Sequence, residues 1–125
     1  MFSHIMFGAN NVETSKTFYD AALGALGVMP GRVDPKGRAM YIQGDSIFMI
    51  SNPIDGNPAS GANGSTIGFA ASSPEDADAF HKAGLAHGGT AIEDPPGWRE
   101  GSGMRLYLAY LRDPSGNKIC AMCRE

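Results

Sequence analysis

The sequence contains one pattern twice, and this internal repeat constrains the fold more than any other feature. Segment 18–27 resembles segment 80–89, with phenylalanine, alanine, leucine and glycine recurring at an interval of 62 residues. At the same interval Asn11 and Ser73 precede the two segments, and both residue types commonly cap the start of a helix. Each copy therefore predicts a short strand, a helix of about three to four turns and a glycine stop.

The two copies also end alike. Segment 44–49 (Gly-Asp-Ser-Ile-Phe-Met) resembles segment 116–121 (Gly-Asn-Lys-Ile-Cys-Ala) at an interval of 72 residues. We predict strands ahead of both glycines, over 38–43 and 105–112. The predicted strand 105–112 is followed by Asp-Pro-Ser-Gly at positions 113–116. We expect these four residues to form a hairpin turn.

The predicted order in each copy is strand, helix and then two or three antiparallel strands, which is an α+β fold. We assign residues 1–52 to a first module and residues 64–125 to a second. Residues 53–63, rich in glycine, proline and asparagine, form the predicted linker. With 125 residues, the chain is expected to be one compact domain.

Two stretches carry a resemblance to a known family. Residues 11–20 (Asn-Val-Glu-Thr-Ser-Lys-Thr-Phe-Tyr-Asp) and 111–119 (Leu-Arg-Asp-Pro-Ser-Gly-Asn-Lys-Ile), on a duplicated chain, resemble the vicinal-oxygen-chelate superfamily of glyoxalases, bleomycin resistance proteins and dioxygenases. The resemblance covers essentially the whole chain. It implies two tandem βαβββ modules that form a curved, cupped, mixed sheet of eight strands with the helices on its convex side, commonly in a homodimer. In that superfamily the cup holds a divalent metal or a small ligand.

The resemblance also indicates where metal ligands would lie. The family's ligands are usually His, Glu or Gln on the first and last strands of each module. Carried over to this sequence, the four positions are His4, Phe48, Thr66 and Cys120. Only His4 is a usual ligand, and a metal site normally needs three or more. We therefore predict no metal site and no cofactor, with His4 as a remnant. A divalent metal in an atypical shell that includes His4 stays open as the alternative.

The two cysteines, Cys120 and Cys123, form a Cys-x-x-Cys pair in an apolar run. Residues three apart on a strand point to opposite faces, so a disulfide is not expected and both are interpreted as small buried hydrophobic residues. If the family geometry holds, Cys120 and His4 both line the cup. A thiol beside an imidazole is a possible nucleophilic dyad, although a filler thiol with a remnant histidine is the preferred interpretation.

A polar, glycine-rich segment over residues 93–103 carries the only tryptophan, Trp98, beside Arg99. One interpretation is a loop that closes over a ligand, with Trp98 stacking and Arg99 pairing with an anion. The other is that Trp98 pins the segment to the body of the protein or to a partner. On the neighbouring strand Tyr107 and Tyr110 point to opposite faces, so only one of them can face the cup.

Charge and composition exclude several classes of function. The formal net charge is −3 and the basic residues are scattered, which argues against nucleic acid as a partner. No apolar run is long enough to cross a membrane, and the first residues do not resemble a signal peptide, so a cytoplasmic location is expected.

Three hypotheses follow. The preferred one is a metal-independent protein that binds a small molecule in its cup, as a homodimer, with a pocket of seven residues: His4, Phe48, Thr66, Trp98, Arg99, Tyr107 and Cys120. The second is a metal-dependent lyase or dioxygenase of the same superfamily. The third is a non-catalytic oligomerising module whose cup is a relic.

Overall fold

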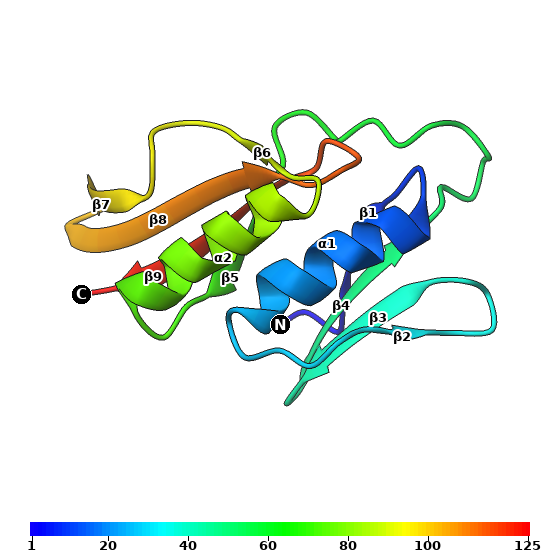
Figure 1. Ribbon diagram of the computed structural model, residues 1–125, viewed down its shortest axis with the longest axis horizontal. Coiled ribbons are helices and arrows are strands. Elements are labelled where there is room, and N and C mark those ends of the chain that lie inside the picture. Colours follow the sequence, from blue (N-terminus) through cyan, green and yellow to red (C-terminus); the bar gives the residue numbers. More distant parts are fainter.

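The computed structural model describes all residues, 1–125, and contains two helices and nine strands (Figure 1). In chain order the elements are β1 (Ile5–Gly8), α1 (Val12–Gly24), β2 (Arg32–Val33), β3 (Ala39–Gln43), β4 (Ser46–Ser51), β5 (Ile67–Ala70), α2 (Pro74–Ala86), β6 (Thr90–Ala91), β7 (Gly97–Gly101), β8 (Met104–Arg112) and β9 (Lys118–Arg124). The predicted α+β fold of two βαβββ modules is confirmed. Neither 13-residue helix is long and apolar enough to traverse a bilayer.

The starts of both helices agree with the sequence. The side chain of Asn11 accepts a hydrogen bond from the Thr14 backbone amide at 2.9 Å, and that of Ser73 accepts one from Asp76 at 3.1 Å. Pro74 occupies the first turn of α2, where its missing N–H costs nothing. The end of α2 differs by one residue from the prediction, because Gly88 and not Gly89 adopts the left-handed conformation (φ 96°).

The strands form two separate sheets rather than one sheet of eight strands. The first sheet has the order β1-β4-β3-β2, and the second has the order β5-β9-β8-β6, with β7 added beside β8. In both sheets the first strand of the module runs parallel to the last one, and the other neighbours are antiparallel. The eight-stranded cup implied by the family resemblance is therefore not closed within one chain.

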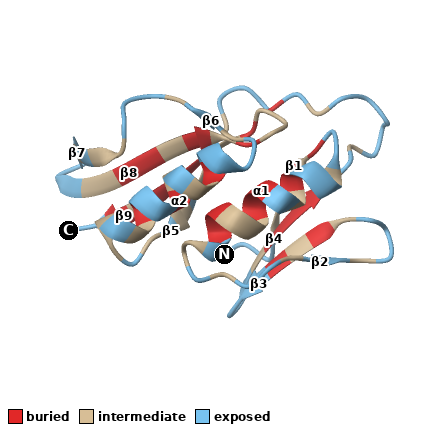
Figure 2. Ribbon diagram, in the orientation of Figure 1, coloured by how far each residue is buried: buried red, intermediate tan, exposed pale blue.

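Helices α1 and α2 pack against each other, and each covers one face of the sheet in its own module (Figure 1). Sixteen buried residues from both modules form one core cluster, which includes Phe18 and Tyr19 of α1 and Ala77 and Phe80 of α2. Figure 2 marks buried positions in red on α1 and on strands of both sheets. Gly84 permits the close approach of α2 to β8 and to α1, since a Cβ atom there would lie 2.4 Å from Leu111 of β8 and 3.0 Å from the Phe18 ring of α1. The opposite face of each sheet has no helix against it.

A buried hydrogen-bond network ties the β8–β9 turn to the first module. The Tyr19 hydroxyl donates to Oδ2 of Asp113 at 2.7 Å, and Nδ2 of Asn117 donates to the same oxygen at 2.8 Å. The backbone amides of Ser115 and Asn117 donate to Oδ1. Asn117 also donates to the carbonyl of Gly8 at 2.8 Å. The turn predicted from Asp-Pro-Ser-Gly thus also connects the two modules.

Candidate functional site

The faces of the two sheets that lie opposite the helices, called the open faces below, correspond to the cup of the family. Neighbouring side chains along a strand point to opposite faces of the sheet. A residue next to one that contacts a helix therefore lies on the open face. Phe48 lies 4.9 Å from the Tyr19 ring of α1, so its neighbour Met49 is on the open face. Cross-strand pairing places Met6 and Met40 beside Met49. The open face of the first sheet is therefore rich in methionine.

The open face of the second sheet is built in the same way. Cys120 pairs with Tyr110 on β8 and with Gly68 on β5. A Cβ atom on Gly68 would lie 3.3 Å from the Cys120 sulfur, which shows that both residues face the same side. Leu108 and Met122, also paired across the strands, continue this face. Apolar and sulfur-containing side chains thus predominate on both open faces.

Phe48 does not belong to the cup, and its assignment there was wrong. The β-strand register aligns Ile5 with Phe48 in the first module and Ile67 with Ile119 in the second. Phe48 is therefore the counterpart of Ile119, and the counterpart of Cys120 is Met49. The interval between equivalent positions of the last strands is 119 − 48 = 71 residues and not 72. The two hairpin connections differ in length, with residues 44–45 between β3 and β4 and residues 113–117 between β8 and β9, so Gly44 and Gly116 are not equivalent. A slip of one residue exchanges the faces of a strand.

The remaining predicted positions differ in their surroundings. His4 is exposed, and its Nδ1 lies 2.9 Å from the Ser3 hydroxyl. Thr66 is also exposed, just ahead of β5. Cys120 is buried, with 5% of its surface exposed, and burial raises the pKa of its thiol to about 11. A thiol with such a pKa is protonated at neutral pH, which does not favour the nucleophilic dyad of His4 and Cys120.

The residues present do not fit the family's metal centre. At the four corresponding positions the structure supplies one imidazole, one thioether, one hydroxyl and one protonated thiol, from His4, Met49, Thr66 and Cys120. Hard divalent cations prefer several carboxylate or imidazole ligands. No three His, Cys, Asp or Glu side chains come together elsewhere in an arrangement that would hold a metal ion.

Trp98 and Tyr107 lie on the helix side of the second sheet and not in the cup. The predicted loop contains strand β7, and Trp98 packs edge-to-face on Tyr107 with 5.3 Å between ring centres. Arg105 lies 4.7 Å from the centre of the Trp98 ring. The Tyr107 hydroxyl donates to Asp78 of α2 at 2.6 Å, and this bond raises the tyrosine pKa to about 12. Trp98 therefore pins β7 to the body of the protein, as the second interpretation of this segment proposed.

Arg99 holds the segment that precedes β7. Its guanidinium donates to four backbone carbonyls, those of Asp94, Pro95, Gly97 and Leu108. No carboxylate is paired with it, so its positive charge persists on the open face, 5.6 Å from the centre of the Tyr110 ring.

Tyr110 is a residue of this face that our predicted pocket omitted. The Lys118 ammonium lies 5.0 Å from the centre of the Tyr110 ring and is paired with Glu93. Alternation along β8 restricted the choice to Tyr107 or Tyr110. The structure places Tyr110 on the open face, paired with Cys120.

Comparisons with known proteins agree with this fold. A family model described as the glyoxalase/bleomycin resistance protein/dioxygenase superfamily matches residues 1–121. The crystal structure of a glyoxalase/bleomycin resistance protein from Albidiferax ferrireducens T118 is 58% identical, with a TM-score of 0.94 and 98% of each chain covered. A comparison with curated proteins found no match.

More distant structures share the fold. A putative glyoxalase from Bacillus halodurans is 20% identical with a TM-score of 0.75, covering 98% of this chain and 94% of the other. A glyoxalase/bleomycin resistance protein/dioxygenase family enzyme from Burkholderia phytofirmans PsJN is 18% identical with a TM-score of 0.72, covering 96% and 95%. The repeated modules, the 58% identity over 98% of the chain and the match over residues 1–121 lead to one conclusion: this chain belongs to the glyoxalase/bleomycin resistance protein/dioxygenase superfamily.

Proposed function

We propose that the protein binds a small, largely apolar molecule, without a metal ion, in a cup that forms when the open faces of two copies meet. The observation that carries this proposal is the composition of the open faces. They combine apolar side chains with a few polar groups, as small-molecule sites do. Met6, Ile42 and Met104 lie on these faces and are about half exposed, at 49%, 52% and 45%.

A second copy is the occupant that the geometry favours. The two sheets of one chain share no strand pairing, so no continuous sheet joins their open faces into a closed cup. Exposed apolar surface on a soluble protein commonly marks an interaction site. The same family commonly forms homodimers, and pairing of the open faces would remove these side chains from water.

The charge on the second sheet indicates the preferred ligand. Arg99 has no carboxylate partner and lies beside the ring of Tyr110. A ligand with an aromatic body and an anionic group would therefore be favoured, since the ring can pack on Tyr110 and the anion can approach Arg99.

The dimer is tested with a charge on the open face. Met6→Arg would place an unpaired cation in the interface, whereas Ala79→Arg adds the same charge on an exposed position of α2. In sedimentation equilibrium we expect dimers for the native protein and for Ala79→Arg, and monomers for Met6→Arg. The measurement is made at about 100 µM protein. If the native protein is monomeric at this concentration, the proposed cup between two copies is contradicted.

Ligand binding and metal content are measured on the same samples. We expect 8-anilinonaphthalene-1-sulfonate to bind the native dimer and Ala79→Arg with a saturable rise in fluorescence, and to bind Met6→Arg at least tenfold more weakly. Chelator treatment should leave this binding unchanged, because the site uses no metal. Stoichiometric zinc, nickel, manganese or iron in the purified protein would overturn the metal-independent assignment.

A further inference from the structure

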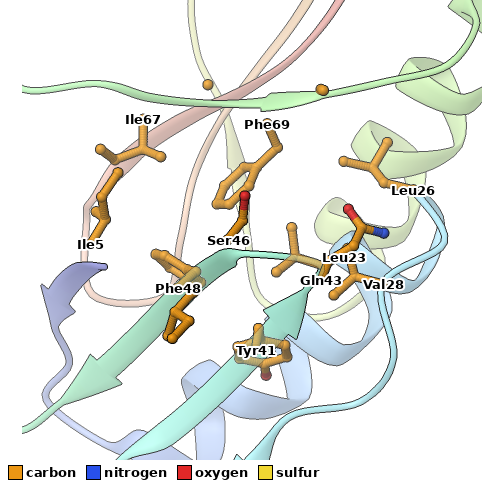
Figure 3. Close-up of a pocket in the computed structure, with 13 residues that line it drawn as sticks. Ile5, Leu23, Leu26, Val28, Tyr41, Gln43, Ser46, Phe48, Ile67 and Phe69 are labelled. Carbon is orange, nitrogen blue, oxygen red and sulfur yellow. The ribbon is translucent and has the colours of Figure 1, made fainter. Parts of the chain in front are cut away.

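A second cavity lies on the helix side of the molecule, between the two modules. Its volume is about 320 Å³. Figure 3 shows β5 on one side of it, β3 and β4 on the other, and the end of α1 with the following segment closing one flank. All of these walls belong to one chain. The cavity is therefore distinct from the cup, which lies on the opposite faces of the sheets.

The walls of this junction cavity are apolar and partly aromatic. Phe48 and Phe69 meet edge-to-face with 5.2 Å between ring centres, and Tyr41 lies 6.0 Å from Phe48. Ile5 and Ile67 line the end of the cavity on the β1 side, as Figure 3 shows. Aromatic rings in this arrangement present both faces and edges, which suits an aromatic guest.

The polar groups of the cavity gather at one place. Gln43 and Ser46 lie opposite each other across the β3–β4 hairpin and are exposed at the rim. The hydroxyl of Tyr41 is already used, since it donates to Asp20 at 2.8 Å. One amide and one hydroxyl are thus placed to bind a single polar substituent, and no charged side chain lines the cavity.

Size and charge define the guest. A dry apolar cavity of about 150 Å³ is known to hold one benzene molecule. The junction cavity is about twice that size, and an ionised guest would lose hydration without gaining an ionic partner. We propose that the junction cavity binds a neutral aromatic molecule of about two fused rings that carries one hydrogen-bonding substituent.

The probe for this site is 1-naphthol, which is neutral at pH 7, with naphthalene-1-sulfonate as its charged counterpart. In titrations followed by NMR of isoleucine methyl groups, we expect saturable shifts at Ile5 and Ile67. From the same titrations, the affinity for naphthalene-1-sulfonate should be at least tenfold weaker than that for 1-naphthol. Equal binding of the two compounds, or shifts confined to the open faces, would overturn the proposal.

Variants separate the cavity from the general surface. Leu26→Trp places an indole in the cavity and should abolish the shifts, whereas Leu85→Trp makes the same change at an exposed position of α2 and should leave them unchanged. Gln43→Ala, at the exposed rim, should weaken binding about 2- to 10-fold through loss of one hydrogen bond. If Leu26→Trp fails to fold, Gln43→Ala decides: native affinity of this variant would refute the predicted orientation and the proposal with it.

The test is independent of the cup. Met6→Arg alters only the open face, so it should retain full affinity for 1-naphthol even where it no longer dimerises. A loss of naphthol binding in Met6→Arg would show that the probe occupies the cup, and would contradict the junction site.

Discussion

Removing a single hydroxyl from the network between the modules should have a large effect. In Tyr19→Phe the ring keeps its buried position, but Oδ2 of Asp113 loses its 2.7 Å hydrogen bond and retains only Asn117 as a donor. The Asp113 side chain is buried, at 3% exposure, so water cannot readily replace the phenol. A buried hydrogen bond to a charged group contributes about 1.5–3 kcal/mol. We therefore expect the free energy of unfolding to fall by about 2 kcal/mol and the melting temperature by roughly 6–12 °C.

Tyr41→Phe is the matched control, because it also removes one tyrosine hydroxyl that donates to a carboxylate. Its acceptor, Asp20, keeps bonds from the Lys16 ammonium at 2.7 Å and the Gly31 amide at 2.9 Å, and is partly exposed. The expected loss is therefore less than about 1 kcal/mol.

Both variants are measured by urea unfolding at pH 7, with the fluorescence of the single tryptophan and far-ultraviolet circular dichroism as probes. Coincident transitions would show that the modules unfold together. The assignment of the network as the tie between modules is refuted if Tyr19→Phe lies within about 0.5 kcal/mol of the native protein, or if Tyr41→Phe loses as much.

Three further predictions use the same measurements. Gly84→Ala should lower the free energy of unfolding by about 1–3 kcal/mol, because the added methyl group overpacks against Leu111 and Phe18. Gly24→Ala, with open space around its Cβ position, should raise the free energy of unfolding by about 0.5–1 kcal/mol. Equal effects of the two variants would contradict the close approach at Gly84. With Cys123 replaced by serine, Cys120 of the folded protein should react with a thiol reagent at pH 8 far more slowly than Cys120 of the protein unfolded in urea. The reason is that a pKa of about 11 leaves about 0.1% of the thiol ionised at this pH. Rapid reaction in the folded protein would contradict the burial of Cys120. Burial, reinforced by the hydrogen bond to Asp20, raises the pKa of Tyr41 above 10.0. Above pH 10 the unfolded chain therefore binds fewer protons than the folded one, and the free energy of unfolding falls as pH rises. Tyr41→Phe should reduce this slope, and an unchanged slope would refute the raised pKa of Tyr41.

Local features of the fold could be predicted because a few neighbouring residues determine them. The caps at Asn11 and Ser73 need only a short polar side chain before an amphipathic segment. The β8–β9 turn follows from proline and glycine at fixed positions, and Gly116 has the positive φ of 90° that such a turn requires. Strand β7 was missed because residues 93–103 are rich in glycine and proline, whereas pairing with β8 and the packing of Trp98 hold it in the sheet.

The site was harder to predict than the fold. The glycines at 44 and 116 match in sequence, but they do not occupy equivalent places in the two hairpins, and the resulting one-residue error put Phe48 on the wrong face. Tyr107 was excluded from the cup only once its contacts with α2 were known. Neither error can be seen from composition or from motif spacing.

The duplicated modules, the order of strands and helices and the family could be recognised in the amino-acid sequence, because each shows in short motifs of neighbouring residues. The open faces, the link between the modules through Asp113 and the cavity between them became visible only in the folded chain. Residues such as Tyr19 and Asp113 are far apart in sequence, and what they do depends on a packing arrangement that no local pattern specifies.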